Sequence, residues 1–230
     1  MKIETIVLIL LLSVTSAAQS QGSKPDRYFE GILSYTYHLL DADGNNLPFP
    51  IEEDLEYRDE NHILNRVIKG ESIRMIGNQE IYLDSEMNEA YQIDHDGKSI
   101  TKILKSKPEP INPIEFRKMG ESTVLNYLCD IYRIQYIHEM RYMKSFFEIK
   151  PDTVTCTFYI ARNLKAPNQK KFAELQGNNN GKIIDGRFPG ITLKVIREHT
   201  DGQKMIIEIQ SIEKREMNDF IKLPPYAFKD

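Results

Sequence analysis

Three short groups of histidine and carboxylate residues have types that can bind a metal ion. His138-Glu139 begins like a zinc-protease motif, but Tyr142 stands where the motif needs its second histidine. Asp94-His95-Asp96 and Asp41-Ala42-Asp43 each precede a glycine, and such sequences favour turns. The later acidic ligands of a calcium loop are missing after the second group. We therefore expect turns at both places, no metal site and no cofactor.

Carboxylates also gather in Glu52-Glu53-Asp54 and at Glu56, and carboxylates are the groups that a glycosidase uses. That chemistry needs two of them at a set spacing across a sugar-binding cleft. Tryptophan usually helps to floor such a cleft, and this chain has none. We expect a solvated acidic edge instead. Serine nucleophile elbows, phosphate loops and redox cysteine pairs are absent from the sequence. We therefore expect that the protein is not an enzyme. Among the functions considered, an enzyme of unrecognised type is the least favoured.

The two cysteines, Cys129 and Cys156, lie on two strands that we expect to be consecutive. Export to an oxidising compartment would permit a disulfide. Side-chain alternation places Cys156 on the face of Phe158 and Cys129 on the face of Ile131 and Arg133, so a bridge would need a bulge. Two alternatives stay open at this point: a disulfide, or two buried free thiols.

Residues Met1 to Ala18 have the pattern of a cleavable signal peptide, because Lys2 precedes a short apolar run and small residues follow it. The run is too short to span a bilayer. We expect residues 19–27 to form a disordered linker and residues 28–230 to form a single β domain. The mature protein would be periplasmic or secreted, without a transmembrane anchor. A formal net charge of −4 argues against nucleic acid as a partner.

Alternation of apolar and polar residues dominates the chain and predicts β-strands. Tight turns between neighbouring segments favour an antiparallel arrangement. The fold class we predict is mostly β, with a single antiparallel sheet of about nine or ten strands and one or few short helices. The expected strands are Tyr28–Leu40, His62–Lys69, Ser72–Ile76, Gln79–Leu83, Ala90–Ile93, Ser99–Leu104, Tyr127–Ile137, Thr153–Ala161, one through Ile191–Val195 and one through Met205–Ile209. Asn168–Gln176 is the expected helix, and Pro224-Pro225 should end regular structure.

The connection from His138 to Lys150 is unusually apolar for a link between two strands. Its apolar residues either extend the two strands into a longer hairpin or form a lip that binds a partner, a lipid or a membrane surface. The candidate partner-binding residues are Met140, Tyr142, Met143, Phe146 and Phe147.

Several stretches spread over nearly the whole mature chain carry a family resemblance. They are Phe29–Tyr35, Ile68–Met75, Tyr82-Leu83-Asp84 with Tyr91, Phe158–Leu164, Phe188-Pro189-Gly190-Ile191 with Leu193, and Ser211–Lys214 through Ile221–Tyr226. On these stretches the chain resembles the secreted domain-of-unknown-function proteins of Gram-negative envelopes that are similar in fold to the lipoprotein carriers LolA and LolB. The Phe188–Ile191 stretch also resembles the related GLPGLI proteins.

The resemblance implies a strongly curved sheet, an open half-barrel with an apolar concave face. In the carriers, helices plug that concavity and acyl chains displace them. This chain has a single convincing helix, which departs from that pattern. The candidate lining residues are Leu33, Tyr35, Tyr37, Phe158, Leu193, Val195, Ile207 and Ile209, and the same residues also suit an ordinary core.

We therefore expect a non-catalytic periplasmic module that holds an apolar ligand, either a lipid or the acyl chain of a lipoprotein. The alternative is a structural or interaction protein of the cell envelope, which would bind a protein partner through residues 138–150 or through a sheet edge.

Overall fold

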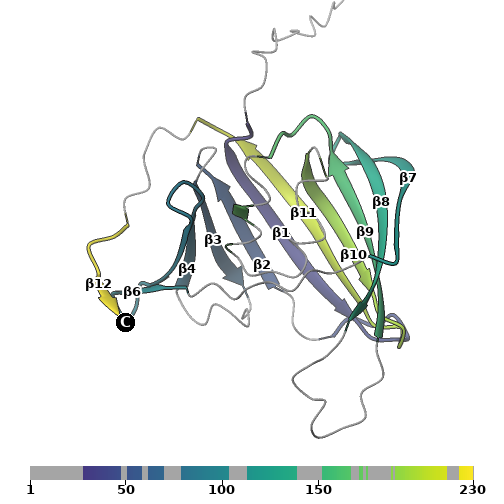
Figure 1. Cartoon of the computed structure of the whole chain (residues 1–230), viewed down its shortest axis with the longest axis horizontal. Helices are drawn as coiled ribbons and strands as arrows, with labels where there is room; N and C mark the ends of the chain where they lie inside the picture. The colour runs from purple at the N-terminus through teal and green to yellow at the C-terminus, as the bar shows by residue number, and fades with distance from the viewer. Residues whose placement is uncertain are drawn as a thin grey trace, which may run out of the picture.

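The computed structural model describes residues 28–47, 51–58, 62–69, 79–103, 113–138, 152–166, 171–172, 175, 188, 190–216 and 223–229. In this part of the chain, twelve strands form one sheet (Figure 1). The strands are β1 (Gly31–Leu40), β2 (Ile51–Tyr57), β3 (His62–Lys69), β4 (Gln79–Asp84), β5 (Glu89–Asp94), β6 (Ser99–Lys102), β7 (Glu115–Val124), β8 (Tyr127–His138), β9 (Asp152–Ala161), β10 (Ile191–Glu198), β11 (Lys204–Lys214) and β12 (Ala227–Lys229).

The strand order is β12-β6-β5-β4-β3-β2-β1-β11-β10-β9-β8-β7, and each adjacent pair is antiparallel except β12 with β6. Two chain-consecutive series, β1 to β6 and β7 to β11, therefore meet where β1 pairs with β11. The prediction of a mostly β, single-sheet protein is confirmed. The predicted strand number was too low, because β2, β7 and β12 were not anticipated. The expected end of regular structure at Pro224-Pro225 was also wrong, since β12 follows it.

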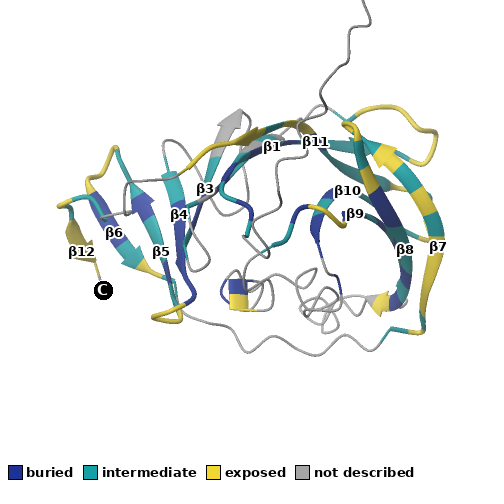
Figure 2. Cartoon of the chain, turned by 90° about the horizontal axis from the view of Figure 1, so that it is seen from above, coloured by how far each residue is buried: buried dark blue, intermediate teal, exposed yellow. Residues whose placement is uncertain are grey.

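The sheet curves into an arch (Figure 2). Register shifts between Ser34 and Tyr35 on β1 and between Thr192 and Lys194 on β10 contribute to this shape. Such bulges bend a strand and increase its twist. The face on the inside of the curve is called the inner face below, and the opposite face is called the outer face.

Two buried clusters lie mainly on the inner side of the sheet. The first joins strand residues, such as Leu33 on β1 and Leu83 on β4, to residues that lie outside the sheet. Its members outside the sheet are Phe29, Leu164, Phe172 and Leu175. The second cluster gathers strand residues around Phe188, and they are Ile134, Tyr136, Val154, Cys156, Phe158 and Ile160. The hydrophobic core is thus built by strand residues together with a few residues that lie outside the sheet.

Only part of the predicted helix Asn168–Gln176 lies within the described residues. Lys171, Phe172 and Leu175 are helical, and both apolar residues among them are buried in the first cluster. The rest of the predicted helix lies outside the described residues.

Gly31 shows why the first strand needs a glycine where it begins. Its φ is +141°, and a Cβ added there would lie 2.0 Å from the carbonyl oxygen of Glu213. Any larger residue would push β1 away from β11, because that oxygen belongs to the backbone of the paired strand.

The outer face carries a smaller apolar cluster near one end of the sheet. Leu64, Tyr82 and Ile93 are buried there, and Leu223 and Tyr226 from the C-terminal segment pack against them. The same segment continues into β12, which adds to the edge of β6. The C-terminal residues therefore cover part of the outer face and extend one edge of the sheet.

Within the described residues, no helix has the length and hydrophobicity needed to span a lipid bilayer. The predicted signal peptide (1–18), the predicted linker (19–27) and the predicted strand Ser72–Ile76 lie outside the described residues.

Candidate ligand-binding face

One row of apolar residues crosses four strands on the inner face. Tyr37 on β1 lies opposite Ile207 on β11, Ile207 lies opposite Val195 on β10, and Val195 lies opposite Phe158 on β9. Residues that are directly opposite in a sheet share one face. Because Phe158 belongs to the second inner cluster, the whole row faces inward. The register thus brings together four of the eight predicted lining residues.

The other four predicted lining residues lie deeper in the core, and Phe158 of the row is fully buried as well. Leu33, Tyr35, Leu193 and Ile209 are buried in the first cluster. Phe158 is buried in the second. The Tyr35 hydroxyl donates a hydrogen bond to the Thr192 carbonyl oxygen at 2.8 Å, which fixes the ring inside the structure. These five lining residues are therefore covered by the chain itself, as the ordinary-core alternative describes.

Five apolar residues of the inner face are only half-buried, and we call them the inner strip. They are Tyr37, Leu39, Val195, Met205 and Ile207. Leu39 lies opposite Met205, on the row next to Tyr37 and Ile207. Tyr37 and Ile207 also contact the first cluster, and Val195 contacts the second. The inner strip therefore lies between the two buried clusters and continues their apolar surface.

Polar groups adjoin the inner strip at Arg197, which lies opposite both Met205 and Cys156. Cys156 is buried, and burial raises the pKa of its thiol to about 11, although the Arg197 charge acts in the opposite direction. Burial also raises the pKa of the Tyr136 hydroxyl, which hydrogen-bonds to Cys156. Burial therefore favours the protonated form of both groups.

Cys129 and Cys156 are both free and buried. Cys129 lies opposite Ala161, whereas Cys156 lies opposite Ile134, five positions further along β8. Five strand residues span roughly 16 Å, and a disulfide needs Cα atoms within about 7 Å. This odd separation also puts the two residues at alternate places in the register, as the sequence pattern predicts. Of the two alternatives, the structure therefore favours two buried thiols over a disulfide.

The predicted partner-binding residues Met140, Tyr142, Met143, Phe146 and Phe147 lie outside the described residues. The strands that flank them are paired up to their ends, since His138 on β8 lies opposite Asp152 on β9. The Asp152 carboxylate accepts hydrogen bonds from the Thr200 backbone at 3.0 Å and from the Thr200 hydroxyl, and it pairs with His199 Nδ1 at 2.5 Å. These contacts tie the β10–β11 turn to the start of β9.

The aspartates that precede glycines do form turns. Asp94 accepts a hydrogen bond from the Gly97 backbone at 2.8 Å, and Asp41 accepts one from the Asn45 backbone at 2.8 Å. His95 points elsewhere, since its Nε2 lies 3.0 Å from Glu80. Among the described residues, no group of three histidine, cysteine or acidic side chains could hold a metal ion.

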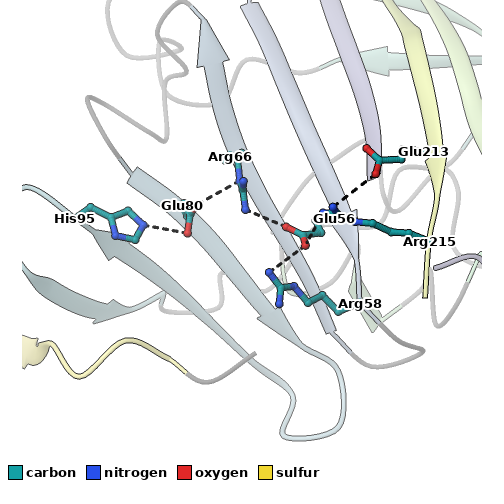
Figure 3. Close-up of polar contacts among 7 residues, drawn as sticks. All are labelled: Glu56, Arg58, Arg66, Glu80, His95, Glu213 and Arg215. Atoms are coloured by element: carbon teal, nitrogen blue, oxygen red, sulfur yellow. Dashed lines mark hydrogen bonds and ion pairs between the residues drawn. The ribbon is translucent and has the colours of Figure 1, made fainter. Parts of the chain in front are cut away.

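The expectation of a solvated acidic edge at Glu56 is wrong. Glu56 is 3% exposed on the outer face and lies 3.0 Å from Arg58, 2.9 Å from Arg66 and 3.5 Å from Arg215 (Figure 3). Arg66 belongs to β3, and Arg215 directly follows β11. Their pairing with one carboxylate of β2 was therefore invisible in the local sequence pattern.

Glu80 extends this network across the neighbouring strands. It lies 3.2 Å from Arg66 and 3.0 Å from His95, and His95 Nδ1 lies 3.3 Å from the Tyr226 hydroxyl. The polar contacts thus connect β2, β3 and β4 to the C-terminal segment. These contacts lie on the outer face, away from the inner strip. We therefore interpret them as contacts that stabilise the sheet.

No family model matches the chain, and a search of curated proteins finds no relative. Solved structures do match over most of their length. LprF from Mycobacterium bovis matches with a TM-score of 0.35 and 7% identity, over 86% of this chain and 90% of that one. A LolA superfamily protein from Nitrosomonas europaea matches with a TM-score of 0.35 and 8% identity, over 87% and 89%.

A third match is a putative outer membrane lipoprotein-sorting protein domain from Vibrio parahaemolyticus, with a TM-score of 0.33 and 8% identity, over 80% of this chain and 85% of that one. The fold class is given by the chain's own twelve-stranded sheet and its register. The relation to GLPGLI proteins stays a prediction.

Proposed function

We propose that this chain is a non-catalytic binding module of the cell envelope whose inner face holds an apolar ligand. The observation that carries the proposal is the inner strip, a group of half-buried apolar residues between two buried clusters. Covering apolar surface is favourable by about 25 cal/mol per Å² removed from water. A ligand that covers the inner strip would gain this free energy by apolar contact.

The clusters on either side limit where such a ligand would lie. Phe172 and Leu175 pack in the first cluster, and Phe188 packs in the second. The chain thus fills both flanks of the inner face with its own side chains. An elongated apolar group, such as the acyl chain of a lipid or lipoprotein, would lie along the strip between them.

The absence of a catalytic role remains part of the proposal. It is supported by the raised pKa of the Cys156 thiol and of the Tyr136 hydroxyl, because burial beside the inner strip holds both groups in the protonated, less nucleophilic form. Export to the periplasm or beyond is supported by the signal-peptide pattern of residues Met1 to Ala18.

Native mass spectrometry of the protein, purified from the periplasm without detergent, tests this function. We expect additional mass that disappears on denaturation and that lipid analysis identifies as an acyl-chain compound. A bare monomer mass, together with no uptake of added lipid, would contradict the proposal.

A second function, binding of a protein partner through a sheet edge, is favoured by one observation. β7 ends the strand order, and large apolar residues on and beside β7 and β8 are exposed. They are Ile114, Phe116, Met119, Leu125, Leu128 and Ile137. Exposed apolar residues at an open strand edge are typical of interaction sites. Changing Met119 and Leu128 to Ser should then abolish capture of an envelope partner, and unchanged capture would count against this function.

A further inference from the structure

Arg197 is a charged residue on an otherwise apolar part of the inner face. Its neighbours across the sheet are Met205 of the inner strip on one side and the buried Cys156 on the other. Beyond them, Leu39 lies opposite Met205, and Ile134 lies opposite Cys156. Arg197 is therefore the one charged residue in the cross-strand row that runs from Leu39 to Ile134.

Arg197 differs from other cations of the β10–β11 hairpin in its partners. Its Nε is buried and has no hydrogen-bond partner within the described part of the chain. On the outer face of the same two strands, Lys194 pairs with Glu208 at 2.9 Å and Lys204 pairs with Glu198 at 2.8 Å. Buried donors in folded proteins are normally satisfied. The Nε atoms of Arg58 and Arg66 are in the same state, but those two arginines pair with Glu56, whereas Arg197 has no ion pair among the described residues. The buried part of its guanidinium group therefore calls for a partner.

The polar side chains next to Arg197 are uncharged, so they do not balance its positive charge. The Tyr136 hydroxyl and the Cys156 thiol both lie within electrostatic reach of its charge. Asp152 also acts on the Tyr136 hydroxyl, but its carboxylate is already held by His199 and Thr200. An anion that enters from outside the described chain would complete this site.

We infer that Arg197 binds the anionic head group of an amphiphile whose acyl chain covers the inner strip. The inference rests on the proposed function and adds the ligand class to it. A guanidinium group suits a carboxylate or a phosphate because it can donate two parallel hydrogen bonds to either. The neighbouring row of Tyr37, Ile207 and Val195 supplies the apolar contact for the chain of the same ligand.

Binding titrations with three single-chain probes test the assignment: oleate with a carboxylate head, 1-oleoyl-lysophosphatidate with a phosphate head, and uncharged monoolein. The wild-type protein should bind at least one anionic probe more tightly than monoolein. Arg197→Gln should raise the dissociation constant of that anionic probe by about tenfold or more. It should change the dissociation constant of monoolein by less than about twofold. The two anionic probes distinguish a carboxylate from a phosphate ligand.

Lys194→Gln is the matched control, because it removes a cation from the outer face of the same strand. It should leave all three affinities unchanged. Arg197→Lys keeps the charge and loses the planar donor pair, so it should give an intermediate affinity. If Arg197→Gln fails to fold, two results still decide the question. They are the affinity of Arg197→Lys and the preference of the wild-type protein for an anionic probe over monoolein.

Equal binding of monoolein and the anionic probes by the wild-type protein would overturn the role of Arg197 and leave the proposed function standing. Equal weakening of all three probes in Arg197→Gln would do the same. Binding of none of the three by the wild-type protein would overturn both the inference and the proposed function.

Discussion

Val195 on β10 lies directly opposite Ile207 on β11, with both side chains on the inner face of the sheet. The next pair along the same strands, Ile196 and Ile206, has its side chains on the outer face. All four residues are half-buried. The hairpin therefore presents a similar apolar pair on each face, and only the inner pair lies between the two inner clusters.

Truncation of a core residue of the inner face should lower stability strongly. Leu33 is 0% exposed, and Leu33→Ala should lower the free energy of unfolding by about 2–5 kcal/mol because it leaves a cavity. Urea unfolding measures this loss. Leu40→Ala on the same strand is the control. Because Leu40 is half-buried, this variant should lose less free energy of unfolding. Equal losses in the two variants would contradict the assignment of Leu33 to the core.

Neutralising Glu56 should destabilise the outer face of the sheet. Glu56→Gln would leave Arg58, Arg66 and Arg215 without the carboxylate that they share. Because the arginines are partly exposed, we expect a loss of about 1–3 kcal/mol, below that of a fully buried pair. Glu213→Gln removes an exposed partner of Arg215 and should cost less than about 1 kcal/mol. A neutral effect of Glu56→Gln in thermal unfolding would show that the network adds no stability.

Acid should weaken the link between β9 and the β10–β11 turn. Burial raises the pKa of Asp152, but hydrogen bonds from Thr200 and His199 outweigh it and lower the pKa from 3.8 to about 2. The carboxylate therefore contributes stability that is present above pH 3.8 and is lost as the pH falls towards 2. This contribution is about 2 kcal/mol. Unfolding free energies of the wild-type protein and Asp152→Asn should converge over this range, and a constant difference would refute the link.

Both cysteines should remain reduced and protected in the folded protein. Cys129 and Cys156 are buried, and burial raises the pKa of both thiols. Iodoacetamide should therefore modify neither in the native state and both after denaturation. Intact-mass measurement should show two thiols. A mass lower by two hydrogens would reveal a disulfide and a register different from the one described.

Local apolar and β-branched patterning between turn residues predicted most strands, including β3 and β4, which bury residues on both faces. His62–Lys69 and Gln79–Leu83 were expected nearly as they are found, as β3 and β4. The alternate places of Cys129 and Cys156 in the register also followed from alternation alone. These features depend on a residue's nearest neighbours in sequence, which a single chain displays directly.

The missed elements depend on partners that lie far away in sequence. β2 is rich in acidic residues, and Glu56 is buried there because Arg66 and Arg215 come from other parts of the sheet. β7 is mostly exposed and lacks an apolar face. β12 is short and forms because β6 offers an edge to pair with. The unpaired Nε of Arg197 likewise becomes visible only once the strands are in register.

The most direct test of the account compares the two apolar pairs of the β10–β11 hairpin. Val195→Ser with Ile207→Ser removes the inner pair, and Ile196→Ser with Ile206→Ser removes the outer pair as the matched control. The measurement is the dissociation constant of monoolein for both double variants and the wild-type protein, each shown to be folded by circular dichroism. We predict that the inner variant binds about tenfold more weakly or worse, while the outer variant binds like the wild-type protein. Equal affinities in the two variants would contradict binding on the inner face.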